Sequence, residues 1–179
     1  MKKRLLNFAA GLSLLAVSGL SGALADSGWY GDVAAEVYDI RIDGQSYFPR
    51  QLKISAGHWL LRDIGLELHA GSSIGSDSSD GFELETAAYQ GVSIRWQSPR
   101  RFIAKAYILT GYGRLQLDGS LDDTGFPGKE WFSGPVLSLG LIFPFSERSG
   151  WNAGLSYNHY FLEDDLKIEG INAVLRYEF

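Results

Sequence analysis

The chain has 179 residues and a formal net charge of −5. This length suits a single domain, and an acidic chain without a basic patch is a poor partner for nucleic acid. The sequence contains no cysteine, which excludes disulfides, thiolate-bound metals and a lipid anchor attached through cysteine.

The first 25 residues have the pattern of a secretory signal peptide. Lys2, Lys3 and Arg4 form a positive start, an apolar stretch covers 5–20, and Ala23-Leu24-Ala25 supplies a small-x-small cleavage site. This pattern favours cleavage over an uncleaved anchor, and we expect a mature chain of 26–179. Removing residues 1–25 takes away three positive charges and no acidic residue, so the formal charge changes from −5 to −8. No apolar run of 18 residues follows residue 25, so the sequence predicts no transmembrane helix there.

Alternation with a period of two recurs along the mature chain and predicts eight strands. They cover about 29–38, 52–60, 64–71, 82–96, 102–117, 131–145 and 151–161, with a last strand that ends at 179. One parity of each run is apolar and the other is mostly polar, and recurrent glycine disfavours helix. Gln90 is a polar residue on the apolar parity of the fourth strand, which indicates a β-bulge or a register shift.

The connections between these strands alternate in length. Short ones near 61–63, 97–101 and 146–150 separate longer polar ones at 39–51, 72–81, 118–130 and 162–170. Transmembrane barrels have short periplasmic turns and longer extracellular loops. Aromatic residues also gather beside the turns and at the opposite strand ends, as interfacial belts do. The sequence therefore predicts an all-β fold, an eight-stranded antiparallel up-and-down transmembrane β-barrel.

The last nine residues, 171–179, alternate strictly and end in Tyr177-Glu178-Phe179. A tilted strand of that length crosses a bilayer. Together with the signal peptide, the Gly-Leu-Glu-Leu run at 65–68 and the alternating loops, this terminus resembles the small eight-stranded outer-membrane barrels of Gram-negative bacteria, the family of the OmpA transmembrane domain and OmpX. The resemblance covers 26–179. It implies an integral outer-membrane protein with extracellular loops and periplasmic termini, whose assembly signal includes Tyr177 and Phe179.

The inward parity of the predicted barrel carries many charged side chains. Because eight strands enclose a space that side chains fill, these charges need to be paired or hydrated. We predict an interior charge network, packed together with the bulky Trp59, Tyr89 and Tyr107, that closes the lumen against general diffusion. A narrow small-solute channel is the alternative. The network is predicted to contain Glu67, Glu83, Glu85, Arg95, Lys105 and Arg176.

Some eight-stranded barrels are lipid A-modifying acyl hydrolases, which need a serine, a histidine base and an acid at the outer leaflet. The candidate region is Ser156-Tyr157-Asn158-His159, followed by Glu163. However, Ser156 and His159 fall on opposite faces of the strand, and Phe161 stands where the His-x-Ser-Asn pattern of deacylases has its serine. We therefore predict no catalytic residues, and keep the deacylase as the alternative function.

The acidic residues at 122–123 and 163–165 provide oxygen ligands but match no calcium-loop spacing, so we predict no metal and no cofactor. A soluble lipocalin-like barrel would place apolar residues inside. The charged residues that oppose apolar faces argue against that fold: Glu67, Glu83, Arg95 and Arg176. We expect a monomer with a structural or surface-interaction role, whose partners are membrane lipids, lipopolysaccharide and the assembly machinery that reads the C-terminal strand.

Overall fold

The computed structural model describes residues 28–42, 44–99, 103–121, 127–146, 149–161 and 167–179. The predicted signal peptide at 1–25 lies outside the described residues. Among the described residues, no helix is long and apolar enough to cross a membrane.

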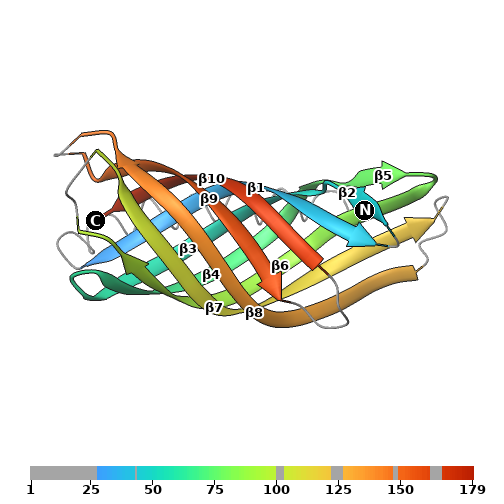
Figure 1. Cartoon of the computed structure of the whole chain (residues 1–179), viewed down its shortest axis with the longest axis horizontal. Coiled ribbons are helices and arrows are strands. Elements are labelled where there is room, and N and C mark those ends of the chain that lie inside the picture. Colours follow the sequence, from blue (N-terminus) through green and yellow to red (C-terminus); the bar gives the residue numbers. More distant parts are fainter. Residues whose placement is uncertain (1–27, 43, 100–102, 122–126, 147–148, 162–166) are drawn as a thin grey trace, which may run out of the picture.

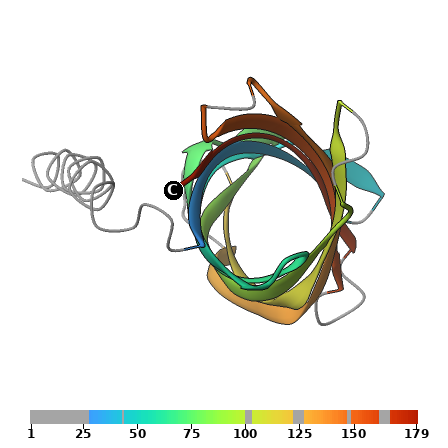
Figure 2. The ribbon, with the colours of Figure 1, turned by 90° about the vertical axis from the view of Figure 1, so that its left-hand side faces the viewer.

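Eight long strands form one closed sheet, and Figures 1 and 2 show the barrel that results. Each strand pairs antiparallel with its neighbours, and the last strand pairs with the first from Tyr30–Glu178 to Arg41–Lys167. The predicted fold class is therefore confirmed. The barrel strands are β1 (Trp29–Ile42), β3 (Arg50–Leu61), β4 (Ile64–Gly75), β6 (Phe82–Gln97), β7 (Lys105–Leu121), β8 (Pro127–Pro144), β9 (Trp151–Phe161) and β10 (Lys167–Glu178).

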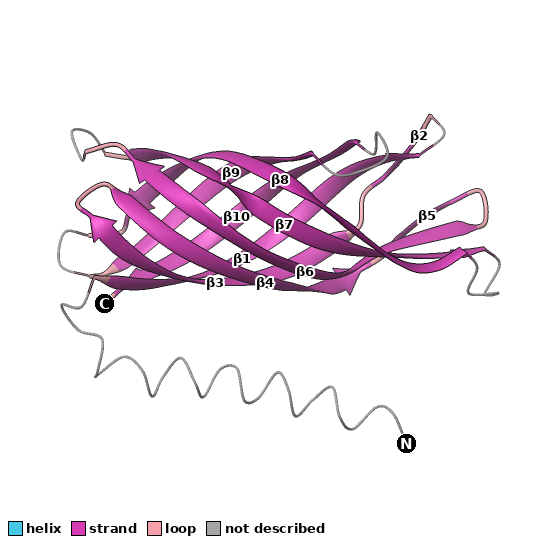
Figure 3. Ribbon diagram, turned by 90° about the horizontal axis from the view of Figure 1, so that it is seen from below, coloured by secondary structure: helices cyan, strands magenta, loops and turns pink. Residues whose placement is uncertain are grey.

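Two short strands that the sequence did not reveal lie inside predicted loops. Strand β2 (Gln45–Tyr47) folds back on the end of β1, and β5 (Asp77–Ser79) pairs with the start of β6. Both lie at the end of the barrel opposite the C-terminus (Figure 3). We call this the loop end, and we call the end where β1 begins and β10 finishes the terminal end.

The outer surface carries an apolar band. Side chains such as Val33, Leu68 and Leu155 are 47%, 62% and 58% exposed, respectively, because one parity of every strand is apolar and faces away from the barrel axis. Toward the loop end every one of the eight strands carries a polar residue on this parity, although Ile74 and Trp131 are exposed apolar residues still farther along β4 and β8. These outward polar residues form a boundary ring of Asp39, Arg50, Ser72, Gln90, Arg114, Ser133, His159 and Glu169.

The interior changes character along the barrel. On β1 the inward side chains run from Tyr30, Asp32 and Glu36 near the terminal end to Tyr38 and Ile40 near the loop end. The polar half holds the charged residues. The other half is a hydrophobic cluster, the loop-end core, formed by Tyr38, Ile40, Tyr47, Leu84, Tyr89, Leu115, Leu117, Tyr160 and Ile168.

A β-bulge in β6 overturns part of the predicted interior. Thr86 pairs with Leu117 and Ala88 with Gln116, so one extra residue stands between them. The extra residue inverts the parity of the strand on its loop-end side, and Leu84 becomes buried. The prediction that Glu83 and Glu85 face inward is therefore wrong. Glu83 is exposed, and Glu85 lies on the same outward parity.

Candidate functional site: the charged barrel interior

An ion pair joins the first and last strands inside the barrel. Asp32 of β1 and Arg176 of β10 are register partners, so their side chains meet directly. Arg176 donates from Nε to Oδ1 and from Nη2 to Oδ2 of Asp32, both at 2.6 Å. Arg176 is fully buried and Asp32 is 8% exposed. Two parallel, charge-assisted bonds of this kind are strong and geometrically specific.

Glu67 of β4 extends this pair into a four-residue cluster. Its Oε1 accepts hydrogen bonds from Arg176 Nη2 at 3.0 Å, from the Tyr30 hydroxyl at 2.9 Å and from Arg95 Nε. Arg95 Nη2 also lies 3.9 Å from Asp32 Oδ2. Two buried carboxylates thus face two buried guanidinium groups. The charges balance, which is the condition under which buried ions are tolerated.

A second ion pair lies nearer the loop end. Lys53 Nζ of β3 is 2.9 Å from Glu36 Oε2. The other carboxylate oxygen, Glu36 Oε1, accepts from Asn158 Nδ2 at 2.6 Å and from the Tyr160 hydroxyl at 2.8 Å. Lys53 Nζ also lies 4.3 Å from the centroid of the Tyr89 ring, a cation–π contact. This pair therefore joins the charged half of the interior to the loop-end core.

Tyrosine rings fill the interior over glycines on nearby strands of the sheet. A Cβ added at Gly57 or Gly65 would overlap Tyr30, and one at Gly140 would overlap Tyr107. The Arg95 guanidinium stacks 3.8 Å from the Tyr107 ring centroid. A cavity of about 40 Å³ lies among these described side chains, with room for only a few water molecules.

His69 bridges three strands beside this cavity. Its Nδ1 lies 2.8 Å from Ser55 Oγ and its Nε2 lies 2.7 Å from Ser93 Oγ. Nε2 is also 3.6 Å from Glu67 Oε2. A serine, a histidine and a carboxylate are thus in contact, as in acyl-transfer sites. Here they are enclosed within the barrel and have no space for a substrate, so the arrangement ties β3, β4 and β6 together.

The structure brings together only part of the predicted network. Glu67, Arg95 and Arg176 share one cluster. Lys105 is instead near the terminal end, where its Nζ lies 3.8 Å from Glu178 Oε1. Glu83 accepts a hydrogen bond from Ser76 outside the barrel. Three further charged residues of the inward parity complete the observed clusters: Asp32, Glu36 and Lys53.

The residues of the deacylase alternative lie apart. Ser156 is buried inside the barrel and donates to Asn172 Oδ1 at 2.6 Å. His159 is on the outer face, with Nδ1 3.7 Å from Glu169 Oε1. The opposite placement of the serine and the histidine agrees with the strand parity. Residue 163 and the acidic residues at 122–123 and 163–165 lie outside the described residues. Within the described ranges, no group of three metal-ligating side chains is close enough to hold an ion.

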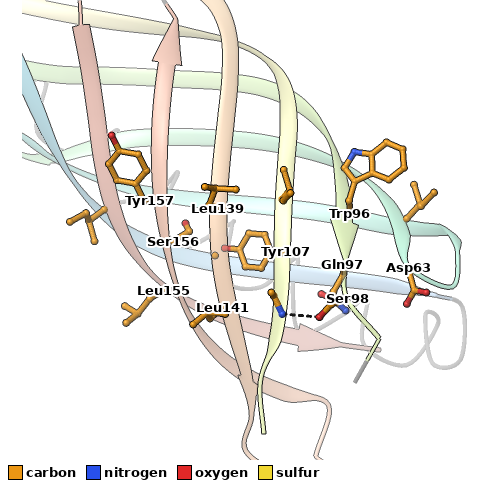
Figure 4. Close-up of a pocket in the computed structure, with 15 residues that line it drawn as sticks. Asp63, Trp96, Gln97, Ser98, Tyr107, Leu139, Leu141, Leu155, Ser156 and Tyr157 are labelled. Atoms are coloured by element: carbon orange, nitrogen blue, oxygen red, sulfur yellow. Dashed lines mark hydrogen bonds between the residues drawn. The ribbon is translucent and has the colours of Figure 1, made fainter. Parts of the chain in front are cut away.

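An open apolar depression of about 910 Å³ lies on the outer face of the barrel wall. Figure 4 shows Trp96 on one side of it, Leu155 and Tyr157 on the other, and Leu139 and Leu141 between them. At its rim the Ser98 hydroxyl oxygen accepts a bond from the Ala106 N–H at 3.0 Å. The described groups in this depression form no charged or catalytic cluster. Its chemistry is that of a surface in contact with hydrocarbon.

An apolar exterior around a charged, closed interior defines the class of protein. Closure satisfies the backbone hydrogen bonds, and the exterior matches lipid, so this is a transmembrane β-barrel. The chain belongs to the family of the outer membrane protein beta-barrel domain, whose model matches residues 8–179. It is therefore an integral outer-membrane protein of bacterial type. A search of curated proteins found no match.

Three solved structures show the likeness. Neisserial surface protein A is 16% identical, with a TM-score of 0.60 over 85% of this chain and 97% of that one. Ail of Yersinia pestis, solved with the heparin analogue sucrose octasulfate, is 16% identical, with a TM-score of 0.62 over 84% and 97%. The N-terminal barrel domain of Pseudomonas aeruginosa OprF is 16% identical, with a TM-score of 0.54 over 82% and 97%. At this identity the likeness is one of fold.

Proposed function

We propose that this protein is a monomeric, non-catalytic outer-membrane barrel with a plugged lumen and a structural or surface-interaction role. The observation that carries the proposal is the filled interior. Two balanced ion-pair clusters and the loop-end core leave a cavity of about 40 Å³. Its partners are then membrane lipids, lipopolysaccharide and, through Tyr177 and Phe179, the assembly machinery.

Planar-bilayer recording of the purified protein tests the plugged lumen. We expect no stable porin-like conductance, because any ion would have to displace the Asp32–Arg176 and Glu36–Lys53 pairs. A porin reconstituted in the same lipid serves as the positive control. Stable, large and weakly selective channels would contradict the proposal, as would a narrow channel that conducts without brief closures.

Lipid A mass spectrometry tests the absence of catalysis. Cells that express the wild-type chain, the His159→Ala variant or no protein are expected to have the same acylation pattern. The support for this expectation is the separation of His159, which faces outward, from Ser156, which is buried inside. Loss of an acyl chain only in cells with the wild-type protein would establish the hydrolase instead.

We further propose that the signal peptide at 1–25 is removed, that the terminal end is periplasmic and that the loop end is extracellular. Short connections lie at the terminal end, as in periplasmic turns. Because the chain has no native cysteine, a single Ser78→Cys in β5 reports the loop end, and Arg62→Cys in the β3–β4 turn reports the terminal end. An impermeant maleimide added to intact cells should label only the first. The reverse labelling would invert the orientation.

The charge of the loop end limits the partners it suits. Its described carboxylates outnumber its described cations, which are Arg41, Arg50, Arg114, Lys129 and Lys167; the carboxylates are Asp39, Asp77, Asp80, Glu83, Glu85, Asp118, Glu130 and Glu169. An extended polyanion such as heparin would meet net repulsion across this surface. We expect no retention of the protein on heparin resin at physiological salt, and salt-dependent retention would oppose this expectation.

A further inference from the structure

Arg114 differs from three of the four other described cations of the loop end; the fourth, Arg50, likewise has no carboxylate partner within ion-pair distance among the described residues. Arg41 Nη2 lies 3.0 Å from Asp39, Lys129 Nζ 3.3 Å from Asp118 and Lys167 Nζ 3.0 Å from Glu169. Each of these charges is already neutralised by a carboxylate. Arg114 instead contacts an amide and an aromatic ring. Among the described residues its guanidinium has no carboxylate partner within ion-pair distance.

The neighbours of Arg114 fix its orientation. Gln90 on β6 and Ser133 on β8 are its register partners. Gln90 Oε1 accepts hydrogen bonds from Arg114 Nε, at 2.9 Å, and from Nη2. The guanidinium carbon lies 4.8 Å from the centroid of the Trp131 ring. One edge of the planar fork is therefore held by the glutamine and one face by the indole, while the Nη1–Nη2 edge keeps its donors for a ligand.

The position of Arg114 suits a charged lipid headgroup. It belongs to the boundary ring, and the preceding outward residue on β7, Tyr112, closes the apolar band and is 54% exposed. The Tyr112 hydroxyl lies 3.4 Å from Ser133 Oγ. On the other side, Asp118 is four residues farther along β7, roughly 13 Å at the rise of a strand, and it is paired with Lys129. An anion at Arg114 would thus meet little local repulsion.

We propose that Arg114, supported by Gln90 and Trp131, binds a phosphate group of lipid A in the outer leaflet. Arginine matches phosphate geometry with two parallel hydrogen bonds, and the nearby hydrocarbon strengthens the attraction by lowering the local dielectric. Tyr112 and Trp131 keep the site at the level of the lipid headgroups, as interfacial aromatic residues do. The assignment rests on the proposed extracellular orientation of the loop end.

Native mass spectrometry of the purified full mature protein in nonionic detergent tests the site. Titration with bisphosphorylated lipid A should show binding that falls about tenfold in Arg114→Gln, the range for hydrogen bonds to a charged group. Arg114→Lys should retain part of the affinity, because the charge remains but the fork is lost. The matched control is Arg41→Gln, whose guanidinium is already occupied by Asp39; it should bind as the wild type does. Unchanged heat-modifiable migration on gels verifies that each variant is folded.

Three results would overturn the assignment. Equal binding of dephosphorylated lipid A by the wild type would remove the phosphate from recognition. Equal, Arg114-dependent binding of phosphatidylglycerol would make the ligand a general phospholipid phosphate. Equal losses in Arg114→Gln and Arg41→Gln would reduce the effect to net charge. The cysteine labelling and the conductance recordings report on orientation and lumen independently, so a failure of the phosphate site is distinguishable from a failure of the proposed function.

Discussion

Arg176 and Asp32 face each other across the seam at which the barrel closes, and they share two hydrogen bonds of 2.6 Å. The two residues are 144 positions apart in sequence. Strands β1 and β10 meet only when the sheet closes on itself, so this ion pair can form only in the closed barrel. It also orients Arg176 toward Glu67 on β4, which links the seam to a strand two places from β1 in the barrel wall.

Replacing Arg176 by Met should destabilise the barrel more than any exposed substitution. Asp32 would remain buried without its bidentate partner, and breaking a buried ion pair in this way costs about 3–5 kcal/mol. Denaturant unfolding in lipid vesicles, followed by tryptophan fluorescence, measures the loss. The control is Arg41→Gln at an exposed pair of the same seam, which should leave the midpoint unchanged. Equal midpoints for the two variants would show that the seam pair contributes little.

The Glu36–Lys53 pair should behave as a coupled unit. Lys53→Met leaves the carboxylate of Glu36 buried and uncompensated, whereas Glu36→Gln keeps one acceptor for Asn158 and Tyr160. We expect the double variant to be more stable than the sum of the single losses predicts, with a coupling of about 1–3 kcal/mol. A double-mutant cycle of unfolding free energies checks this expectation. Additive losses would mean that the two charges do not interact.

Strand parity predicted most of the barrel, because a period of two fixes which side chains face lipid wherever pairing is regular. The β9 strand was predicted with its observed bounds, 151–161. Gln90 predicts a bulge or a register shift in the fourth strand but does not locate it. The sequence therefore predicts Glu83 and Glu85 inside, whereas the extra residue at the Thr86–Ala88 bulge inverts the parity of that part of the strand. Likewise, the partner of Arg176 depends on register between strands at opposite ends of the chain, which local alternation does not specify.

Gly140→Ala should destabilise the barrel although the change is small. The new Cβ would overlap the ring of Tyr107, which stacks on Arg95. Overpacking of this kind costs about 1–3 kcal/mol. Gly31→Ala is the matched control, because its Cβ would lie 3.7 Å from the nearest other atom, Ser55 O, an ordinary contact. Thermal unfolding read by heat-modifiable gel migration compares the two, and a lower transition for Gly31→Ala would refute the packing argument.

Deleting Phe179 should lower the amount of inserted barrel several-fold. The Phe179 N–H donates to Trp29 O at 3.0 Å and so continues the pairing between the last strand and the first. The Phe179 ring packs edge-to-face on the Tyr177 ring, with 5.0 Å between the centroids. Phe179→Asp should have the same effect. Phe145→Ala, a 63% exposed aromatic at the same end, controls for loss of a ring alone. The readout is protease-resistant, folded protein in the outer-membrane fraction, and undiminished amounts would count against the assembly signal.

Because of the loop-end core, each long strand passes through two environments: its terminal-end half faces lipid, and its loop-end half faces water. On β7, Ile108 meets lipid with its apolar side outward, whereas Leu115 and Leu117 are buried inside, under a surface that carries Arg114 and Asp118. The loop-end half of the strand therefore has apolar residues inside and polar residues outside, as in a water-soluble protein. Interior substitutions in that half should change stability as they do in the core of a water-soluble protein. Surface substitutions there should leave the lipid-facing surface unchanged. A single continuous sheet thus lets the exposed part diversify while the embedded part stays constrained by hydrocarbon.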